Sequence, residues 1–151
     1  TYQVHEYPHG KEAVDGIHVA QAMGEDPCCV FKTLITQANT REYLVFMIPV
    51  GEELDLKLAA KHAGVKHTEM IPVKDITKVS GYVRGGCTAV GMKKQFPAFL
   101  DVKKSYRTFI DSSALTQSHI YFSGGKIGLQ IEMDPKQLID LLSIAPCPLT
   151  K

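Results

Sequence analysis

The order of hydrophobic and polar positions predicts short strands interspersed with helices. Alternating or β-branched apolar runs predict strands at residues 2–7, 28–36, 42–49, 98–101, 108–111, 119–123 and 127–132. The polar stretch 37–41 separates two of these runs, and Gly124-Gly125 separates two others, so both pairs are expected to form antiparallel hairpins. The resulting sheet should be mixed and mostly antiparallel.

Helical spacing of apolar residues appears in four segments, at residues 11–23, 56–63, 72–79 and 135–142. Asp55 precedes the second of these and Gly64 follows it, which are the residue types that begin and end helices. Asp134 and Pro135 open the last helix in the same way. Helices and hairpins do not alternate strictly, so the pattern indicates the α+β class, with residues 1–151 forming one domain.

Length and composition agree with a soluble single domain. The chain has 151 residues, of which 44% are hydrophobic and 22% are charged. Its formal net charge is only +1, so any contact with nucleic acid must come from a local basic patch. The longest apolar run, residues 44–50, is too short to cross a bilayer, and no secretory signal leads the chain. We therefore expect a cytoplasmic protein that does not bind membranes.

The four cysteines do not form a known framework. Cys28 and Cys29 are adjacent, Cys87 and Cys147 are isolated, and no C-x-x-C pair occurs. If residues 28–36 form a strand, the first two thiols point in opposite directions and cannot share a metal ion. We expect reduced thiols, no bound metal and no cofactor.

Lys32 is the most unusual side chain in the pattern. In a strand it lies on the same side as Val30 and Leu34, while Phe31 and Thr33 lie on the other side. Neither side is typical of a solvated surface, so burial should lower the pKa of the amine unless an anion meets it. A cleft that receives a carboxylate, a phosphate or a developing oxyanion would explain this position. A lysine that extends into water from an edge strand would explain it equally well.

Glycines mark a second candidate region. Residues 81–91 contain four glycines, and Gly85-Gly86 would let the backbone N–H groups approach an anion closely. The segment matches neither the P-loop nor the dinucleotide-binding motif, so a structural turn is the alternative. The same alternative applies to Ser123, which ends a strand just before Gly124-Gly125.

Conventional catalytic groups are sparse. Cys87 could act as a nucleophile beside one of six histidines, but no spacing favours a particular pair. A basic cluster could contact phosphates or could simply be a solvated surface. Its members are Arg84, Lys93, Lys94, Lys103, Lys104 and Arg107.

Several segments together resemble the YbaK/EbsC family, whose members are related to the editing domain inserted in bacterial prolyl-tRNA synthetases. The matching segments are residues 30–34 (VFKTL), 54–57 (LDLK), 81–94 (GYVRGGCTAVGMKK) and 120–132 (IYFSGGKIGLQIE). The resemblance extends from residue 5 to the final helix. It implies a barrel-like mixed sheet surrounded by helices, with the family's usual leading helix missing before Thr1. It also implies hydrolysis of mischarged aminoacyl-tRNA, most typically Cys-tRNA(Pro).

The resemblance also implies roles for individual residues. Lys32 corresponds to the family's pocket lysine and Thr33 to its polar neighbour. Tyr7 and Ser123 correspond to further pocket residues. Gly85, Gly86 and Gly91 belong to the loop that lines the aminoacyl site. Independently of the resemblance, the basic cluster described above makes Arg84, Lys93 and Lys94 the expected tRNA contacts. The partners implied are tRNA(Pro) and prolyl-tRNA synthetase, and we expect the protein to be a monomer.

Three positions depart from the family pattern. Ala89 replaces a proline that is common in the glycine loop, Asp15 stands where some members carry a phenylalanine, and Gln130 stands where some carry an aspartate. These changes bear on which amino acid is preferred.

The proposed chemistry needs no strong enzyme nucleophile, because an aminoacyl ester is already activated. We expect Lys32 and the amides of Gly85 and Gly86 to stabilise charge on the ester carbonyl. In cysteine-editing relatives the substrate thiol is thought to attack its own ester. The alternatives are water-mediated hydrolysis of Ala-tRNA(Pro) and a non-catalytic module that binds tRNA or a synthetase.

Overall fold

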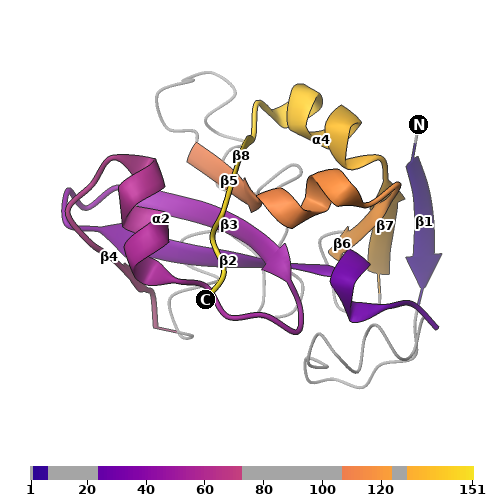
Figure 1. Ribbon diagram of the computed structural model, residues 1–151, viewed down its shortest axis with the longest axis horizontal. Coiled ribbons are helices and arrows are strands. Elements are labelled where there is room, and N and C mark those ends of the chain that lie inside the picture. Colours follow the sequence, from indigo (N-terminus) through magenta and orange to yellow (C-terminus); the bar gives the residue numbers. More distant parts are fainter. Residues whose placement is uncertain (1, 7–23, 73–106, 124–128) are drawn as a thin grey trace.

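The computed structural model describes residues 2–6, 24–72, 107–123 and 129–151. These residues form eight strands in two sheets, together with two α-helices and two short 3-10 helices (Figure 1). The strands are β1 (Tyr2–Glu6), β2 (Phe31–Ala38), β3 (Tyr43–Pro49), β4 (Thr68–Met70), β5 (Arg107–Asp111), β6 (Ile120–Ser123), β7 (Leu129–Met133) and β8 (Ala145–Cys147). The helices are η1 (Pro27–Cys29), α2 (Leu56–Ala63), η6 (Ser112–Thr116) and α4 (Pro135–Leu142).

The two sheets meet at the beginning of β2. The larger sheet has the order β4-β2-β3-β5-β8 and the smaller one β1-β7-β6. β3 pairs along one edge of β2, and β4 pairs with the end of its other edge. A parallel bridge between Val30 and Tyr121 brings β6 alongside the start of β2. β3, β5 and β8 pair in parallel, and the other pairs are antiparallel, as the mostly antiparallel prediction requires.

One hydrophobic core fills the space between the two sheets. Alternate residues of β2 and β3, including Phe31, Ile35 and Met47, face Ile120 and Phe122 of β6. Helix α4 lies beside the smaller sheet (Figure 1). Its Leu138 is fully buried in this core. Because alternate side chains of a strand point to opposite sides, the remaining residues of β2 and β3 point to the other face of the larger sheet.

A second core lies on the opposite face of the larger sheet. Leu44, Phe46 and Ile48 of β3 pack there against Ala59 and Ala63 of α2. The small alanine side chains let the helix lie close to the sheet, and α2 crosses β2 and β3 in Figure 1. Both faces of β2 and β3 are therefore apolar, which explains why their sequences do not alternate between hydrophobic and polar residues.

Both helices begin and end as their sequences predict. The Asp55 carboxylate accepts hydrogen bonds from the backbone N–H groups of Lys57 (2.9 Å) and Leu58 (3.1 Å), and Gly64 ends α2 with φ of 72°. The Asp134 carboxylate accepts from the Lys136 N–H (2.8 Å), and Pro135 occupies the first turn of α4. Orphan donors at both helix N-termini are thereby satisfied.

The α+β class, the β2–β3 hairpin, the antiparallel pairing of β6 with β7 and both of these helices are confirmed. One local prediction is wrong: Cys28 and Cys29 lie in η1 rather than in a strand. Asp26 caps this turn and Pro27 opens it, which favours a helical turn over an extended chain.

The pattern also failed to predict two strands, β4 and β8, which have three residues each. Such short segments carry too little periodicity to be recognised. The predicted helix at 11–23, most of that at 72–79, the strand at 98–101 and the Gly124-Gly125 turn lie outside the described residues. Among the helices that the structure describes, none is long and apolar enough to cross a membrane.

Candidate functional site

Lys32 lies near the start of β2, where the two sheets meet. It pairs in register with Ile48 and shares its side of the strand with Leu34, so its aliphatic stem lies among apolar neighbours. The side chain is half-buried, and this burial lowers the pKa of the amine, although the nearby charges of Glu53 and Glu52 partly oppose the change. The sequence prediction of a cation in apolar surroundings is confirmed.

Within the described part of the chain, Lys32 forms no ion pair. Glu53 pairs instead with the terminal residue, Lys151, at 3.3 Å between Nζ and Oε2. A half-buried ammonium without a close counter-ion is costly to maintain, so it is available to an anionic or electron-rich group of a ligand.

The register of the strands places three residues of the smaller sheet in one row, and a bridge brings this sheet to the start of β2. His5 of β1 is opposite Gln130 of β7, and Gln130 is opposite Ser123 of β6. The isolated Val30–Tyr121 bridge brings β6 alongside the start of β2, two residues before Lys32 in one strand and two residues before Ser123 in the other. Val30 and Tyr121 also touch in a small apolar cluster, so Lys32 belongs to the same side as Tyr121.

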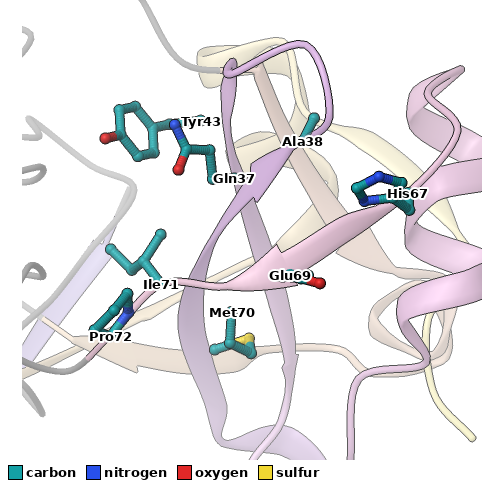
Figure 2. A pocket seen from close by; sticks show the side chains of 8 residues that line it. All are labelled: Gln37, Ala38, Tyr43, His67, Glu69, Met70, Ile71 and Pro72. Atoms are coloured by element: carbon teal, nitrogen blue, oxygen red, sulfur yellow. The ribbon is translucent and has the colours of Figure 1, made fainter.

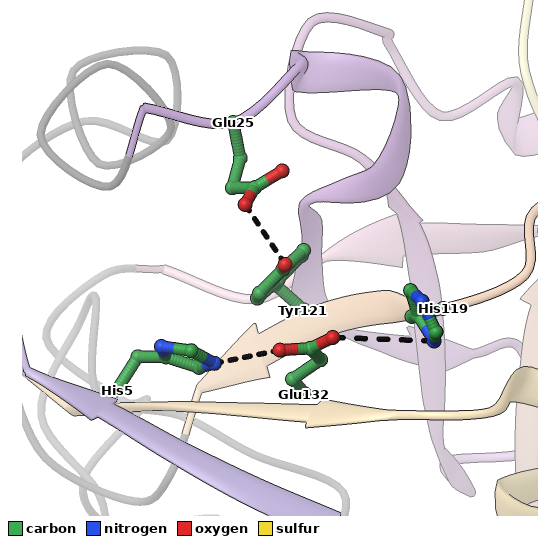
Figure 3. A network of polar contacts seen from close by, with 5 residues as sticks. All are labelled: His5, Glu25, His119, Tyr121 and Glu132. Carbon is green, nitrogen blue, oxygen red and sulfur yellow. Dashed lines mark hydrogen bonds and ion pairs between the residues drawn. The ribbon is translucent and has the colours of Figure 1, made fainter.

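This side of the smaller sheet, opposite to the core, is the polar face, and we define it by His5, Tyr121, Gln130 and Glu132. Its centre is a hydrogen-bonded network (Figure 3). His5 Nε2 donates to Glu132 Oε1 at 2.7 Å, because a carboxylate can only accept. His119 Nδ1 lies 3.9 Å from the other carboxylate oxygen, so Glu132 is flanked by two imidazoles.

Tyr121 joins this network to the segment before η1. Its hydroxyl donates to Glu25 Oε1 at 2.9 Å, and its ring meets the His5 ring edge-on with centroids 5.4 Å apart. Burial, the hydrogen bond to Glu25 and the charge of Glu132 together raise the pKa of Tyr121 well above its ordinary value. Tyr121 therefore stays protonated and acts as a donor.

Gln130 carries a buried polar atom on the polar face. The residue is only 5% exposed, and its side-chain oxygen has no hydrogen-bond partner among the described residues. A buried acceptor without a donor costs about 1–3 kcal/mol. The structure thus holds an acceptor in the same row as His5 and Ser123, where a ligand could supply the donor.

The remaining sequence-predicted site residues have different outcomes. Thr33 points away from Lys32 toward the core between the sheets, and its hydroxyl also has no partner among the described residues. The backbone of Ser123 is placed, but its side chain lies outside the description. The residues that cannot be placed are Tyr7, Asp15, Arg84, Gly85, Gly86, Cys87, Ala89, Gly91, Lys93, Lys94, Lys103 and Lys104. Arg107, the described member of the basic cluster, begins β5 and pairs with Glu42.

The network around Glu132 was not foreseen from the sequence. His5, His119 and Glu132 are far apart in the chain and belong to no local motif, so only the strand pairing brings them together. The available signal was the presence of Gln130 and Glu132 at alternate positions of an otherwise apolar strand.

Two other features contribute no chemistry to the polar face. The pKa of the Cys29 thiol is raised, first by burial and then by Glu25 and Asp26, so the thiol is a poor nucleophile. In the part of the chain that is described, no cluster of three or more histidine, cysteine, aspartate or glutamate side chains could hold a metal ion.

A separate groove of about 230 Å³ lies at the far end of β2 (Figure 2). Gln37, Tyr43, His67 and Glu69 line it together with apolar neighbours. Residue 37 is five positions from Lys32, or about 16 Å along a strand, so this groove does not belong to the polar face.

Comparison with known proteins gives consistent results. Residues 11–141 match the family model of the aminoacyl-tRNA editing domain. The chain is 38% identical over 140 residues to EbsC of Enterococcus faecalis, a protein named as a Cys-tRNA(Pro)/Cys-tRNA(Cys) deacylase. That match covers 93% of this chain and 79% of EbsC.

Solved structures share the fold at lower identity. A protein described as a trans-editing enzyme for prolyl-tRNA synthetase has a TM-score of 0.81 at 19% identity, and the match covers 99% of this chain and 87% of that one. A hypothetical protein has a TM-score of 0.83 at 17% identity, with coverage of 100% and 92%. These matches show the fold alone.

Proposed function

Because the chain belongs to the aminoacyl-tRNA editing domain family, we propose that it is a deacylase that removes cysteine from mischarged Cys-tRNA(Pro). The family membership supports aminoacyl-tRNA editing as the activity. The preference for cysteine and for tRNA(Pro) rests on the 38% identity to EbsC, whose name carries that substrate.

One observation carries the proposal: among the described residues, a half-buried lysine without an ion pair lies at the start of β2, next to the sheet that holds a buried acceptor without a hydrogen bond. Lys32 offers a cation to the electron-rich end of an aminoacyl ester, and Gln130 offers an oxygen to a donor at the other end. Structural ion pairs or hydrogen bonds would normally satisfy such groups, and their absence among the described residues is typical of a site that awaits a ligand.

The reaction can proceed without an enzyme nucleophile. The substrate sulfur forms a bond to the ester carbonyl carbon while Lys32, with the amides of Gly85 and Gly86, stabilises the negative charge on the carbonyl oxygen. The bond from that carbon to the ribose oxygen then breaks, and the proton from the thiol ends on the released tRNA hydroxyl. The cyclic thiolactone that leaves is opened by water to give cysteine.

A panel of three esters tests this proposal. The purified protein is incubated with cysteinyl-, alanyl- and prolyl-tRNA(Pro), and release of each amino acid is measured. We expect rapid release of cysteine and little release of alanine or proline, because neither has a thiol. Release of alanine at the rate of cysteine would contradict attack by the substrate thiol.

Water-mediated hydrolysis of Ala-tRNA(Pro) is the second candidate, and one observation favours it. His5 donates from Nε2 to Glu132, so the neutral ring has an unprotonated Nδ1, as a general base for water requires. If alanine release dominates in the panel, a loss of alanine release in a folded His5→Gln variant would identify this route.

Binding without turnover would indicate the third alternative, a non-catalytic module. We propose that the protein acts in the cytoplasm as a monomer, alone or with prolyl-tRNA synthetase.

A further inference from the structure

A row of polar side chains crosses three strands in the groove at the far end of β2 (Figure 2). Gln37 of β2 is in register with Tyr43 of β3 and with Glu69 of β4, so the three side chains point to the same face of the larger sheet. Ile71, which is buried, adds an apolar wall to the groove. The groove thus offers an amide, a phenol and a carboxylate beside an apolar surface.

Two turns meet at one end of this groove and are held together by Asn39. Its Oδ1 accepts hydrogen bonds from the backbone N–H groups of Lys66 (3.0 Å) and His67 (3.3 Å), and its own N–H donates to the His67 carbonyl at 3.0 Å. His67 lines the groove, and Gln37 Nε2 donates to the Arg41 carbonyl at 3.3 Å. The β2–β3 turn that carries Arg41 and the α2–β4 turn that carries Lys66 are therefore fixed beside each other and beside the groove.

The side chains of Arg41 and Lys66 are exposed, and the ion pairs of the described residues involve neither of them. The carboxylate next to Arg41 in the chain, that of Glu42, binds Arg107 at 2.6 and 2.9 Å instead. Arg41 has a φ of 70°, in the left-handed region that glycine and asparagine favour, so an arginine there is unfavourable for folding. Both cations are available to an anion from outside the chain.

These groups match the parts of a ribonucleotide. A phosphate binds to cations, which Arg41 and Lys66 provide at the edge of the groove. The Glu69 carboxylate can only accept a hydrogen bond, and a ribose hydroxyl can donate one. The same carboxylate repels the acidic side chains of a protein, the other polyanion that two cations could attract. The arrangement therefore favours RNA over an acidic protein surface.

We propose that this groove binds a ribonucleotide of an RNA strand, with its phosphate at Arg41 and Lys66 and its 2′-hydroxyl at Glu69. The identification of this RNA as a tRNA rests on the proposed function. The groove is about 16 Å from Lys32 along β2, so it holds a nucleotide other than the one that carries the amino acid. The site contributes to RNA binding and takes no part in cleavage of the ester.

An RNA hairpin with the acceptor-stem sequence and the unpaired 3′ end of tRNA(Pro), without an amino acid, tests the site. Its binding is measured by fluorescence anisotropy over a series of KCl concentrations. The comparison is a 2′-fluoro hairpin of the same sequence, which keeps the A-form helix but lacks the hydroxyl donor. The wild-type protein should bind the RNA at least about tenfold more tightly, as a hydrogen bond to a charged group provides.

Variants then assign both effects to the groove. Arg41→Gln and Lys66→Gln should each weaken binding of both hairpins and lower the slope of log K against log[KCl] by about 1, because one phosphate contact is lost. Glu69→Met should remove the preference for the 2′-hydroxyl, whereas Glu69→Gln keeps an acceptor and should retain more of it. Lys61→Gln removes one charge from the exposed side of α2, and it should keep the wild-type slope and preference.

The outcomes separate this site from the proposed function. Wild-type slopes in folded Arg41→Gln and Lys66→Gln, or an undiminished preference in Glu69→Met, would overturn the site and leave the deacylase proposal intact. Competition by free CMP or by polyglutamate as strong as that by unlabelled hairpin would also overturn it, since the groove would then bind a mononucleotide or an acidic protein surface. If the hairpin binds as expected but the wild type releases no amino acid in the ester panel, the site stands and the proposed function fails.

Discussion

Lys32 combines a charged amine with apolar surroundings. Leu34 and Ile48 lie beside it, and burial lowers the pKa of its amine. Such a residue is expected to reduce stability and to be retained for function, because activity often requires an environment that folding alone would not favour.

Replacing this amine by an apolar group of similar length should therefore stabilise the protein. Lys32→Met is expected to raise the free energy of unfolding at pH 7 by about 0.5 kcal/mol, the lower end of the usual range, because the amine is only half-buried. The folded-state pKa lies below the unfolded value of 10.5, so the penalty is full at neutral pH and is relieved as pH rises toward 10.5. Urea denaturation of both proteins at several pH values measures this.

The gain in Lys32→Met should consequently shrink as the solution becomes more alkaline. A gain that increases with pH would show that the ammonium stabilises the folded state. Lys61→Met, an exposed position on α2, is the matched control and should show no such trend.

At the same scale, the sequence identified some residues of the site and not others. Lys32 was recognisable because its unusual context is local: the residues on either side of it are apolar. Gln130 appeared only as a departure from the family pattern, and Glu132 did not appear at all. Their importance depends on partners from β1, β6 and the segment before β6, which no window of sequence contains.

Among the elements, α4 shows how a sequence signal becomes a packing contact. Asp134 satisfies the Lys136 N–H, Pro135 fixes the first turn, and the helix can then bury Leu138 in the core between the sheets. The cap therefore stabilises the helix that places Leu138 in the core.

Removing this cap should destabilise the protein measurably. Asp134→Ala is expected to lower the free energy of unfolding by about 1 kcal/mol, because the hydrogen bond to the Lys136 N–H is lost. Asp140→Ala removes the same charge from an exposed position within the helix and should have an effect close to zero. Similar losses in the two variants, measured by thermal unfolding, would exclude a specific capping effect.

Element prediction succeeded where length and end signals agreed. Helices α2 and α4 and the β2–β3 hairpin have strong periodicity and recognisable boundaries. η1 was mistaken for a strand because its two cysteines precede a β-branched residue, although Asp26-Pro27 signalled a turn. β4 and β8 are extended because they pair with β2 and β5. These partners are distant in sequence, so a local pattern does not reveal them.

The whole molecule is organised around two cores on opposite faces of the larger sheet. β2 and β3 contribute to both cores, so neither core can be lost without exposing the other side of the same strands. The two cores should therefore unfold together as one cooperative unit.

A pair of large-to-small substitutions tests this cooperativity. Phe122→Ala in the core between the sheets and Phe46→Ala in the core beneath α2 should each cost about 3–5 kcal/mol, because both side chains are fully buried. Circular dichroism and tyrosine fluorescence should report one shared transition in each variant. Separate transitions in either variant would show that the cores are independent.

The sequence pattern predicted the fold class and the mostly antiparallel sheet, because these follow from the order of elements. It could not predict that the Val30–Tyr121 bridge joins the two sheets. That contact links residues about ninety positions apart, yet it is what brings the start of β2, which carries Lys32, next to β6.

The most direct test of the account is the rate of cysteine release from Cys-tRNA(Pro) by Lys32→Ala under single-turnover conditions. We expect a loss of about 10²–10³-fold, because a group that stabilises the developing oxyanion is removed. Lys61→Ala should retain the wild-type rate, and circular dichroism should show that both variants are folded. A folded Lys32→Ala protein that releases cysteine at the wild-type rate would contradict the account.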